Sequence, residues 1–225
     1  FRRHDAVAAY EPIVGAGPNA CVLHYRANSA ALADGDLLLI DAGAEYQGYA
    51  ADISRTFPIS GRFSAPQRAL YEVVLAAQRA AIAAARPGAS WIAPHEAAVE
   101  SLTEGLLRLG LLKGTLAQCL REQASRRFYM HKTGHWLGLD VHDVGDYRID
   151  GEYRLLEPGM VFTVEPGLYI PPGSKGVAAK WQGIGIRIED DVAITAEGNE
   201  VLTEGAPKDV DAIESLMAET NRAAA

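Results

Sequence analysis

The sequence predicts a domain of mixed α and β structure, because a helical middle section separates two regions of strand character and the composition is that of a compact protein. The 225 residues are 48% hydrophobic and 22% charged, values close to the average of soluble globular domains. A chain of this length can bury a sizeable core as one domain. We therefore expect a single domain over residues 1–225.

Three helices are predicted in the middle of the chain. The first begins at Ser64-Ala65-Pro66, where a capping residue precedes an early proline, and ends at Arg86-Pro87-Gly88. The second covers about 94–109, with leucines at helical spacing and Gly110 at the C-cap position. A shorter third helix is expected over 115–125.

The strand regions, 13–57 and 128–195, contain an internal repeat. Residues 35–43 align without a gap on residues 159–167. In both copies a glycine precedes an apolar strand that ends in a carboxylate, and another glycine follows two residues later. Such a repeat predicts two related halves that meet around a shared site. Few residues precede the first half, so we expect that an N-terminal portion of the domain is missing.

Composition excludes several classes of protein. The 29 acidic and 21 basic residues give a net charge of -8, which repels nucleic-acid phosphates and anionic membranes. No apolar run approaches the roughly 18 residues of a membrane span. The two cysteines, Cys21 and Cys119, lack the spacing of zinc sites or disulfide frameworks, so we expect both to be buried and reduced. No signal-peptide pattern is present, and a cytoplasmic location is expected.

Two aspartates flank a predicted hairpin turn. Strands over 37–45 and 50–57 would place Asp41 and Asp52 on one face of the hairpin. A turn at Tyr46-Gln47 would pair the two aspartates directly, whereas a turn at Gln47-Gly48 would make them diagonal neighbours. Adjacent like charges destabilise a strand pair unless a cation lies between them. The alternative is a bulge that turns one aspartate to water.

Three further features add acids and histidines. Glu165 ends an apolar strand and is expected to face a cleft, whereas Gly185-Ile186-Arg187-Ile188-Glu189 alternates, which places Arg187 and Glu189 on one face; an outer polar face is the alternative. His131 and His135 have the spacing of a helical zinc motif, but the motif's glutamate is absent and Gly134 disfavours a helix. With His142 they still form a cluster typical of a site.

The acids and one histidine together predict a metal centre. Two divalent cations would neutralise four carboxylates, and one histidine would add a neutral nitrogen ligand: Asp41, Asp52, Glu165, Glu189 and His135. A carboxylate-rich set favours octahedral, oxygen-preferring metals, so manganese is expected first, with cobalt or zinc as alternatives.

The same segments resemble the Xaa-Pro aminopeptidase (aminopeptidase P) family of pita-bread metallopeptidases over nearly the whole chain. The resemblance implies an α+β pita-bread fold with two pseudo-symmetric halves, a curved antiparallel sheet and outer helices. Family members usually carry a separate N-terminal domain, which this sequence lacks, and the full-length protein is expected to be a homo-oligomer. The motifs that carry the resemblance are Ile40-Asp41-Ala42-Gly43, Asp52-Ile53-Ser54-Arg55-Thr56-Phe57, the run from Gly134-His135-Trp136 to Val144-Gly145, Thr163-Val164-Glu165-Pro166-Gly167-Leu168-Tyr169 and Gly185-Ile186-Arg187-Ile188-Glu189-Asp190.

The resemblance also implies roles for individual residues. Asp41, Asp52, His135, Glu165 and Glu189 match the family's five metal ligands, with Asp52 and Glu189 bridging two ions. Other matches are to histidines around the substrate and to an arginine behind the ligands: His24, His131, His142 and Arg187. The implied reaction is hydrolysis of the bond between an N-terminal residue and a following proline. A hydroxide shared by the two metals would attack, and Glu165 would shuttle the proton.

Other functions remain open at this point. A prolidase of the same fold would cleave Xaa-Pro dipeptides alone, and a methionine aminopeptidase or creatinase-like hydrolase matches the motifs less closely. A non-catalytic binding module of the same fold is expected to have lost metal ligands, whereas all five are present here. The negative charge opposes a nucleic-acid binder.

Overall fold

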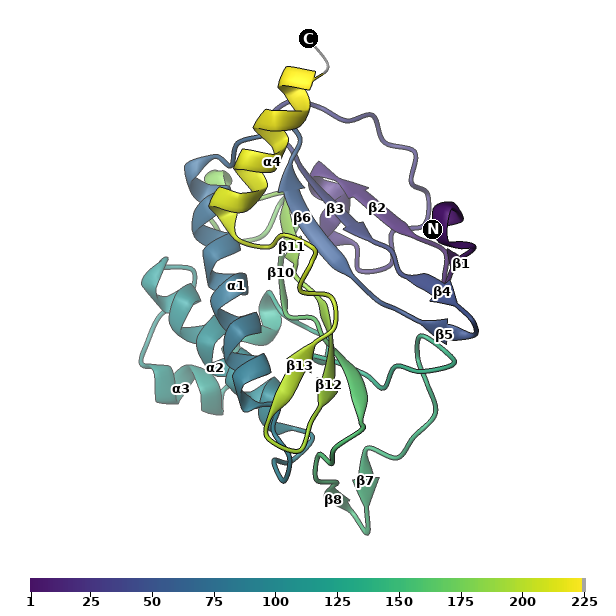
Figure 1. Cartoon of the computed structure of the whole chain (residues 1–225). Helices are drawn as coiled ribbons and strands as arrows, with labels where there is room; N and C mark the ends of the chain where they lie inside the picture. The colour runs from purple at the N-terminus through teal and green to yellow at the C-terminus, as the bar shows by residue number, and fades with distance from the viewer. Residues whose placement is uncertain (224–225) are drawn as a thin grey trace.

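The computed structural model, which describes residues 1–223, places the helices on one side of a set of antiparallel strands (Figure 1). Helices α1 (Ala65–Ala84) and α2 (Ala93–Arg108) pack side by side, with α3 (Leu116–Arg121) against α2 and α4 (Val210–Ala223) against α1. Short 3-10 helices complete the helical elements: η1 (Arg2–His4), η2 (Gly17–Cys21), η3 (Ala124–Arg127) and η4 (Ala179–Trp181).

The strands of the described residues form small antiparallel sheets. In the first strand region, one sheet has the order β2-β3-β6 and another the order β1-β4-β5: β1 (Val7–Ala8), β2 (Ile13–Ala16), β3 (Leu37–Asp41), β4 (Ala44–Tyr46), β5 (Tyr49–Ala50) and β6 (Ser54–Pro58). In the second, β9 and β13 flank β12, β10 pairs with β11, and β7 pairs with β8: β7 (Arg148–Ile149), β8 (Glu152–Tyr153), β9 (Val161–Val164), β10 (Gly167–Ile170), β11 (Ile184–Arg187), β12 (Asp190–Ile194) and β13 (Asn199–Val201).

The first strand region contains one long hairpin interrupted near its middle. The β3–β6 and β4–β5 pairs share one register, and the turn between them lies at Gln47-Gly48, where both residues have positive φ. Asp41 and Asp52 are therefore diagonal, as the second of the two predicted turns requires. The predicted continuous strands are wrong at 42–43 and 51–53. The hairpin closes tightly there, since a Cβ on Gly43 would lie 1.5 Å from the Ala51 carbonyl oxygen.

The second region has the same plan. The β9–β12 and β10–β11 pairs continue one register across a gap, in which the Ile188 amide donates to the Pro166 carbonyl at 3.3 Å. This register places Glu165 opposite Glu189. Each predicted copy of the repeat is thus a strand that ends at an acid, a short interruption, and a second strand. The two pseudo-symmetric halves predicted from the sequence are confirmed.

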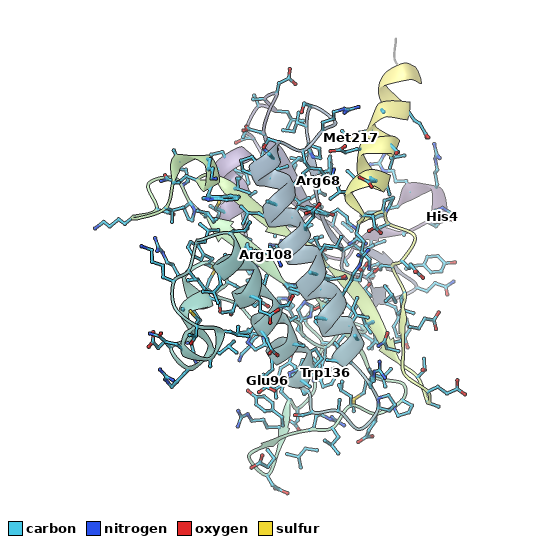
Figure 2. All side chains as sticks on the ribbon, turned by 90° about the vertical axis from the view of Figure 1, so that its left-hand side faces the viewer. His4, Arg68, Glu96, Arg108, Trp136 and Met217 are labelled. Carbon is cyan, nitrogen blue, oxygen red and sulfur yellow. The ribbon has the colours of Figure 1, made fainter. Side chains whose placement is uncertain are left out.

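Helix predictions hold best where caps are explicit. Ser64 and Gln67 form a capping box at the start of α1, and Gly110 (φ 72°) follows the end of α2. Figure 2 shows this helical face, with Arg68 on α1 and Arg108 at the end of α2. One expectation was wrong, because the third helix is two short pieces separated at Gln123, which has left-handed backbone (φ 51°). Helix α4 was not predicted.

Strand β11 lies in the interior, which excludes an outer polar face for 185–189. It packs against α1 on one side and against β3 and β6 on the other. Ile186 and Ile188 are fully buried, and Arg187 and Glu189 are only 4% and 2% exposed. The polar face of this strand therefore points into the molecule, toward the first half.

The remaining sequence expectations concern cysteines and membranes. Both cysteines are free thiols; Cys119 is buried, but Cys21 is only half-buried, because it lies at the end of η2 near the surface. Among the described residues no helix has both the length and the apolar composition needed to cross a membrane.

Candidate active site and metal centre

A single cavity of about 640 Å³ contains every site residue predicted from the sequence. The strands of both halves and the loop after η3 supply its wall. The predicted residues that line it are Asp41, Asp52, Glu165, Glu189, Arg187, His24, His131, His135 and His142. Residues far apart in the sequence are thus brought together as the repeat requires.

Three of these residues form a compact donor group. One ligand atom each of Asp52, His135 and Glu189 lies within 4.8 Å of the others. His135 Nδ1 is 3.0 Å from the Trp136 carbonyl, which can only accept a hydrogen bond. In the neutral ring Nδ1 therefore carries the proton, and Nε2 presents its lone pair to the carboxylates of Asp52 (3.4 Å) and Glu165 (3.8 Å). This is the tautomer that a metal-ligating histidine needs.

Asp41 and Asp52 share one phenol. Tyr10 lies with its hydroxyl 2.5 Å from an oxygen of each aspartate. The single phenol proton is thus shared between two acceptors, one on each carboxylate. Burial raises the pKa of Asp41, and the negative Asp52 raises it further, while Arg187 opposes the shift. Asp41 therefore holds a proton more readily than an exposed aspartate does.

Arg187 connects the two halves. Its guanidinium donates to Asp41 at 2.6 Å, to the Ser54 hydroxyl at 2.8 Å and to the Tyr169 hydroxyl at 3.2 Å. Ser54 in turn donates to Glu189 at 2.7 Å. A buried arginine with several hydrogen-bond partners holds these acids in place.

The two glutamates lie opposite each other, with Glu189 buried and Glu165 half-buried on the cavity wall. Burial raises the pKa of Glu165 to about 7, with Arg187 and His135 opposing and the nearby aspartates adding to the shift. Burial also raises the pKa of Glu189, and repulsion from Asp52 and Glu165 adds to it. Divalent cations among these oxygens would reverse both shifts. The donor set, carboxylates plus one oriented imidazole, therefore fits hard divalent cations.

His131 is held neutral beside Glu165. Its Nδ1 contacts the Lys132 carbonyl at 2.7 Å, so Nδ1 carries the proton and Nε2 accepts from the Tyr169 hydroxyl at 2.9 Å. Burial lowers the pKa of His131 to about 4. His142 lies with its ring 4.3 Å from that of His135. His24 lines both the main cavity and an adjoining recess of about 190 Å³.

Sequence reasoning missed several supporting residues. Ser54 and Tyr169 lie in the quoted motifs, two residues after Asp52 and Gly167, where strand periodicity would have indicated the same face. Thr133 hydrogen-bonds Tyr129 and His95 through its hydroxyl and accepts from the Glu165 amide at 2.8 Å. Nothing in the sequence marks Tyr10, because it precedes the first long strand.

Comparisons with known proteins agree with this geometry. Xaa-Pro aminopeptidases from Escherichia coli and Haemophilus influenzae are 50% and 51% identical over 218 residues, which is 96% of this chain but 49% and 50% of theirs. A solved aminopeptidase from Pseudomonas aeruginosa is 57% identical with a TM-score of 0.97, covering 98% of this chain and 50% of that one.

A structure of an Escherichia coli aminopeptidase P variant in complex with substrate is 49% identical with a TM-score of 0.95, covering 99% of this chain and 50% of that one. The chain thus spans about half the length of the relatives it matches, and its fold is the α+β pita-bread fold of these neighbours. The model of metallopeptidase family M24 matches residues 1–196. With this match over most of its length, the chain belongs to metallopeptidase family M24.

Proposed function

We propose that this chain carries the active site of an Xaa-Pro aminopeptidase, which removes the first residue from peptides whose second residue is proline. The observation that carries the proposal is the convergence of all nine predicted site residues on one cavity. The high identity to Xaa-Pro aminopeptidases of two bacteria supports the substrate class. A non-catalytic module is disfavoured, because every predicted metal ligand is retained and lines the cavity.

We assign the metal site to the five predicted ligands, which would hold two divalent cations. The orientation of His135 Nε2 and the 4.8 Å donor group support this assignment. Manganese is the metal we expect, since oxygen donors dominate. When bound, the cations would supply Lewis-acid activation of water and of the scissile carbonyl.

Side chains of the protein can accept and transfer the proton of the attacking water. In this proposal Glu165 accepts a proton from the attacking water and passes it to the departing proline nitrogen. Its neighbour His131 is neutral and oriented, so it can hydrogen-bond the peptide without adding charge. Arg187 and Ser54 hold Asp41 and Glu189 in position while the proton moves.

Substrate binding follows from the shape of the site. Asp41 offers a negative partner for the free amine, which favours peptide ends over internal bonds. The recess beside His24 and His142 has room for a small first side chain, and the main cavity has room for the proline and the residues after it. The assignment of 1–225 to one catalytic domain without its N-terminal part remains a prediction. A homo-oligomeric full-length protein and a cytoplasmic location also remain predictions.

The test compares an Xaa-Pro-Xaa tripeptide with an Xaa-Pro dipeptide, using metal-stripped protein with and without manganese. We expect manganese-dependent cleavage of the tripeptide. Cleavage of the dipeptide alone would establish the prolidase alternative instead. Metal binding without cleavage of either peptide would contradict an active site complete within this chain, and failure to bind metal would overturn the enzyme proposal.

A further inference from the structure

The mouth of the main cavity carries two cations that the metal site does not use. Lys132 and Arg148 both line the cavity, together with the ring of Tyr153. Within the described part of the chain neither cation forms an ion pair with an acid, whereas Arg187 at the cavity floor is paired with Asp41. Four acids line the cavity at the metal site, and Lys132 and Arg148 line it without an acid partner.

Arg148 is oriented by the hairpin that bears it. Strands β7 and β8 are joined by Asp150-Gly151, whose positive φ values of 53° and 87° are typical of a tight two-residue hairpin turn. The Arg148 guanidinium donates to the Gly151 carbonyl at 2.8 Å and lies over the Tyr153 ring, 3.9 Å from its centre. These contacts orient the guanidinium and leave N–H groups free for a ligand.

The base of this hairpin is anchored by aromatic stacking. Tyr147, which precedes β7, stacks on Trp136 with ring centres 5.6 Å apart and planes 6° from parallel. Trp91 contacts both rings, at 4.9 Å and 4.1 Å. The hairpin projects from the end of the molecule in Figure 1, and Trp136 lies near that end in Figure 2. Packed aromatic rings at its base fix where the hairpin leaves the fold.

The positive charge of Lys132 also acts on the Tyr153 hydroxyl. It follows His131, whose imidazole is bonded to the Lys132 carbonyl, so its backbone is fixed at the cavity wall. Arg148 lowers the pKa of Tyr153 most, and the positive Lys132 side chain lowers it further. Both cations therefore act on Tyr153, and all three residues line the same cavity.

We propose that Lys132 and Arg148 form a carboxylate-binding subsite for the part of the peptide that leaves with proline; this inference rests on the proposed aminopeptidase function. The carboxylate is the C-terminus of a tripeptide or an acidic side chain after the proline. With its amine at the acidic floor, an extended peptide advances by roughly 3.3–3.6 Å per residue toward the mouth. Two cations there, one with a planar guanidinium, are suited to a carboxylate.

The test measures kcat/KM of the full-length, manganese-loaded protein for three peptides: an Xaa-Pro-Ala free acid, the same peptide as a C-terminal amide, and an Xaa-Pro-Glu amide. We expect the free acid to exceed the alanine amide by roughly five- to tenfold, the effect of two partly exposed charge contacts. An Xaa-Pro-Glu amide that regains the rate of the free acid would identify a side-chain carboxylate as a second ligand of the same subsite. If it stays at the rate of the alanine amide, the subsite is specific for the C-terminus.

Variants locate the effect. Lys132→Gln and Arg148→Gln should each reduce the ratio of acid to amide, and the double variant should bring it below about twofold. Arg108→Gln removes the same charge from an exposed position outside the cavity and should preserve the ratio. Equal rates for acid and amide in the unaltered protein, or an unchanged ratio in the double variant, would overturn the subsite alone. Failure to cleave any of the peptides would overturn the aminopeptidase proposal and this inference with it.

Discussion

The two halves of this protein follow one backbone plan but place their acids differently. In the first half the acids are diagonal: Asp41 pairs with Ser54 in the ladder, and Asp52 lies in the interruption. In the second half Glu165 and Glu189 lie directly opposite each other. Directly opposed like charges are the less stable arrangement. The second half therefore needs hydrogen-bond donors or cations beside this pair of glutamates.

One ion pair and one hydrogen bond to the buried acids cross between the halves. Arg187 of the second half is bonded to Asp41 of the first, and Ser54 of the first half donates to Glu189 of the second. Neither hairpin alone satisfies its own buried acids. The repeat therefore supplies the backbone scaffold, and contacts between its two copies position the side chains of the site.

The second half also has a support that the first lacks. The Thr133 carbonyl accepts a hydrogen bond from the Glu165 amide, and the Thr133 hydroxyl hydrogen-bonds His95 of α2 and Tyr129. This chain of contacts connects Glu165 to the helical layer. Asp41, its counterpart in the repeat, is held instead by Tyr10 and Arg187.

The largest expected effect follows from the proposed role of Glu165. Glu165→Gln keeps the side-chain size but cannot accept the water's proton, so kcat should fall by roughly 10²–10⁴-fold. Steady-state cleavage of an Xaa-Pro-Xaa peptide measures this, with metal content checked in the same samples. Glu200→Gln, on exposed β13, is the matched control and should have little effect. Near-normal turnover of Glu165→Gln with full metal content would remove the proton-shuttle role.

Breaking the link between the halves should cost stability. Arg187→Gln leaves Asp41 buried without its cation, and we expect the free energy of unfolding to fall by about 3–5 kcal/mol in metal-free protein. Urea denaturation measures the change. Arg68→Gln removes an arginine from exposed pairs with Glu72 and Asp211 and should have a much smaller effect. Similar losses for both variants would show that the halves are held together without this contact.

The equivalent glycines of the repeat offer a direct comparison. A Cβ on Gly43 would lie 1.5 Å from a backbone oxygen, whereas one on Gly167 would lie 2.5 Å from the Tyr169 hydroxyl and 2.7 Å from the Ile186 carbonyl. We expect Gly43→Ala to cost about 3 kcal/mol and Gly167→Ala about 1–2 kcal/mol in thermal unfolding. Gly35→Ala and Gly159→Ala, with positive φ but open space, should cost similar, smaller amounts. The reverse order for Gly43 and Gly167 would show that the first interruption is the looser one.

The smallest effect concerns the support for Glu165. Burial lowers the pKa of His95 from 6.5 to about 4, with positive Lys132 adding to the shift. The unfolded chain therefore takes up a proton first, so the contribution of His95 is complete above pH 6.5 and is lost as the pH falls toward 4. Allowing for partial exposure, the loss is about 1 kcal/mol. His95→Gln should flatten the dependence of stability on pH in this window, and an unchanged slope would assign it to other groups.

The sequence by itself determined the class of the fold, the repeat and the set of site residues. Helix caps at Ser64 and Gly110, alternation in the strands and the repeated glycine–strand–acid pattern are local signals, because each depends only on nearby residues. Family motifs then identified the residues that the structure brings into one cavity. Their roles as metal ligands and catalysts stay predictions.

Only the tertiary structure decided how these residues are held. Residues 185–189 are buried on both faces because α1 and the first half pack around β11. No local sequence pattern indicates this packing. The contacts of Tyr10 with two aspartates, of Arg187 with Asp41 and of Thr133 with Glu165 join residues distant along the chain or outside any recognisable motif. Periodicity in a sequence specifies which side of an element is polar, but the partner that satisfies that side comes from another element, and packing alone selects it.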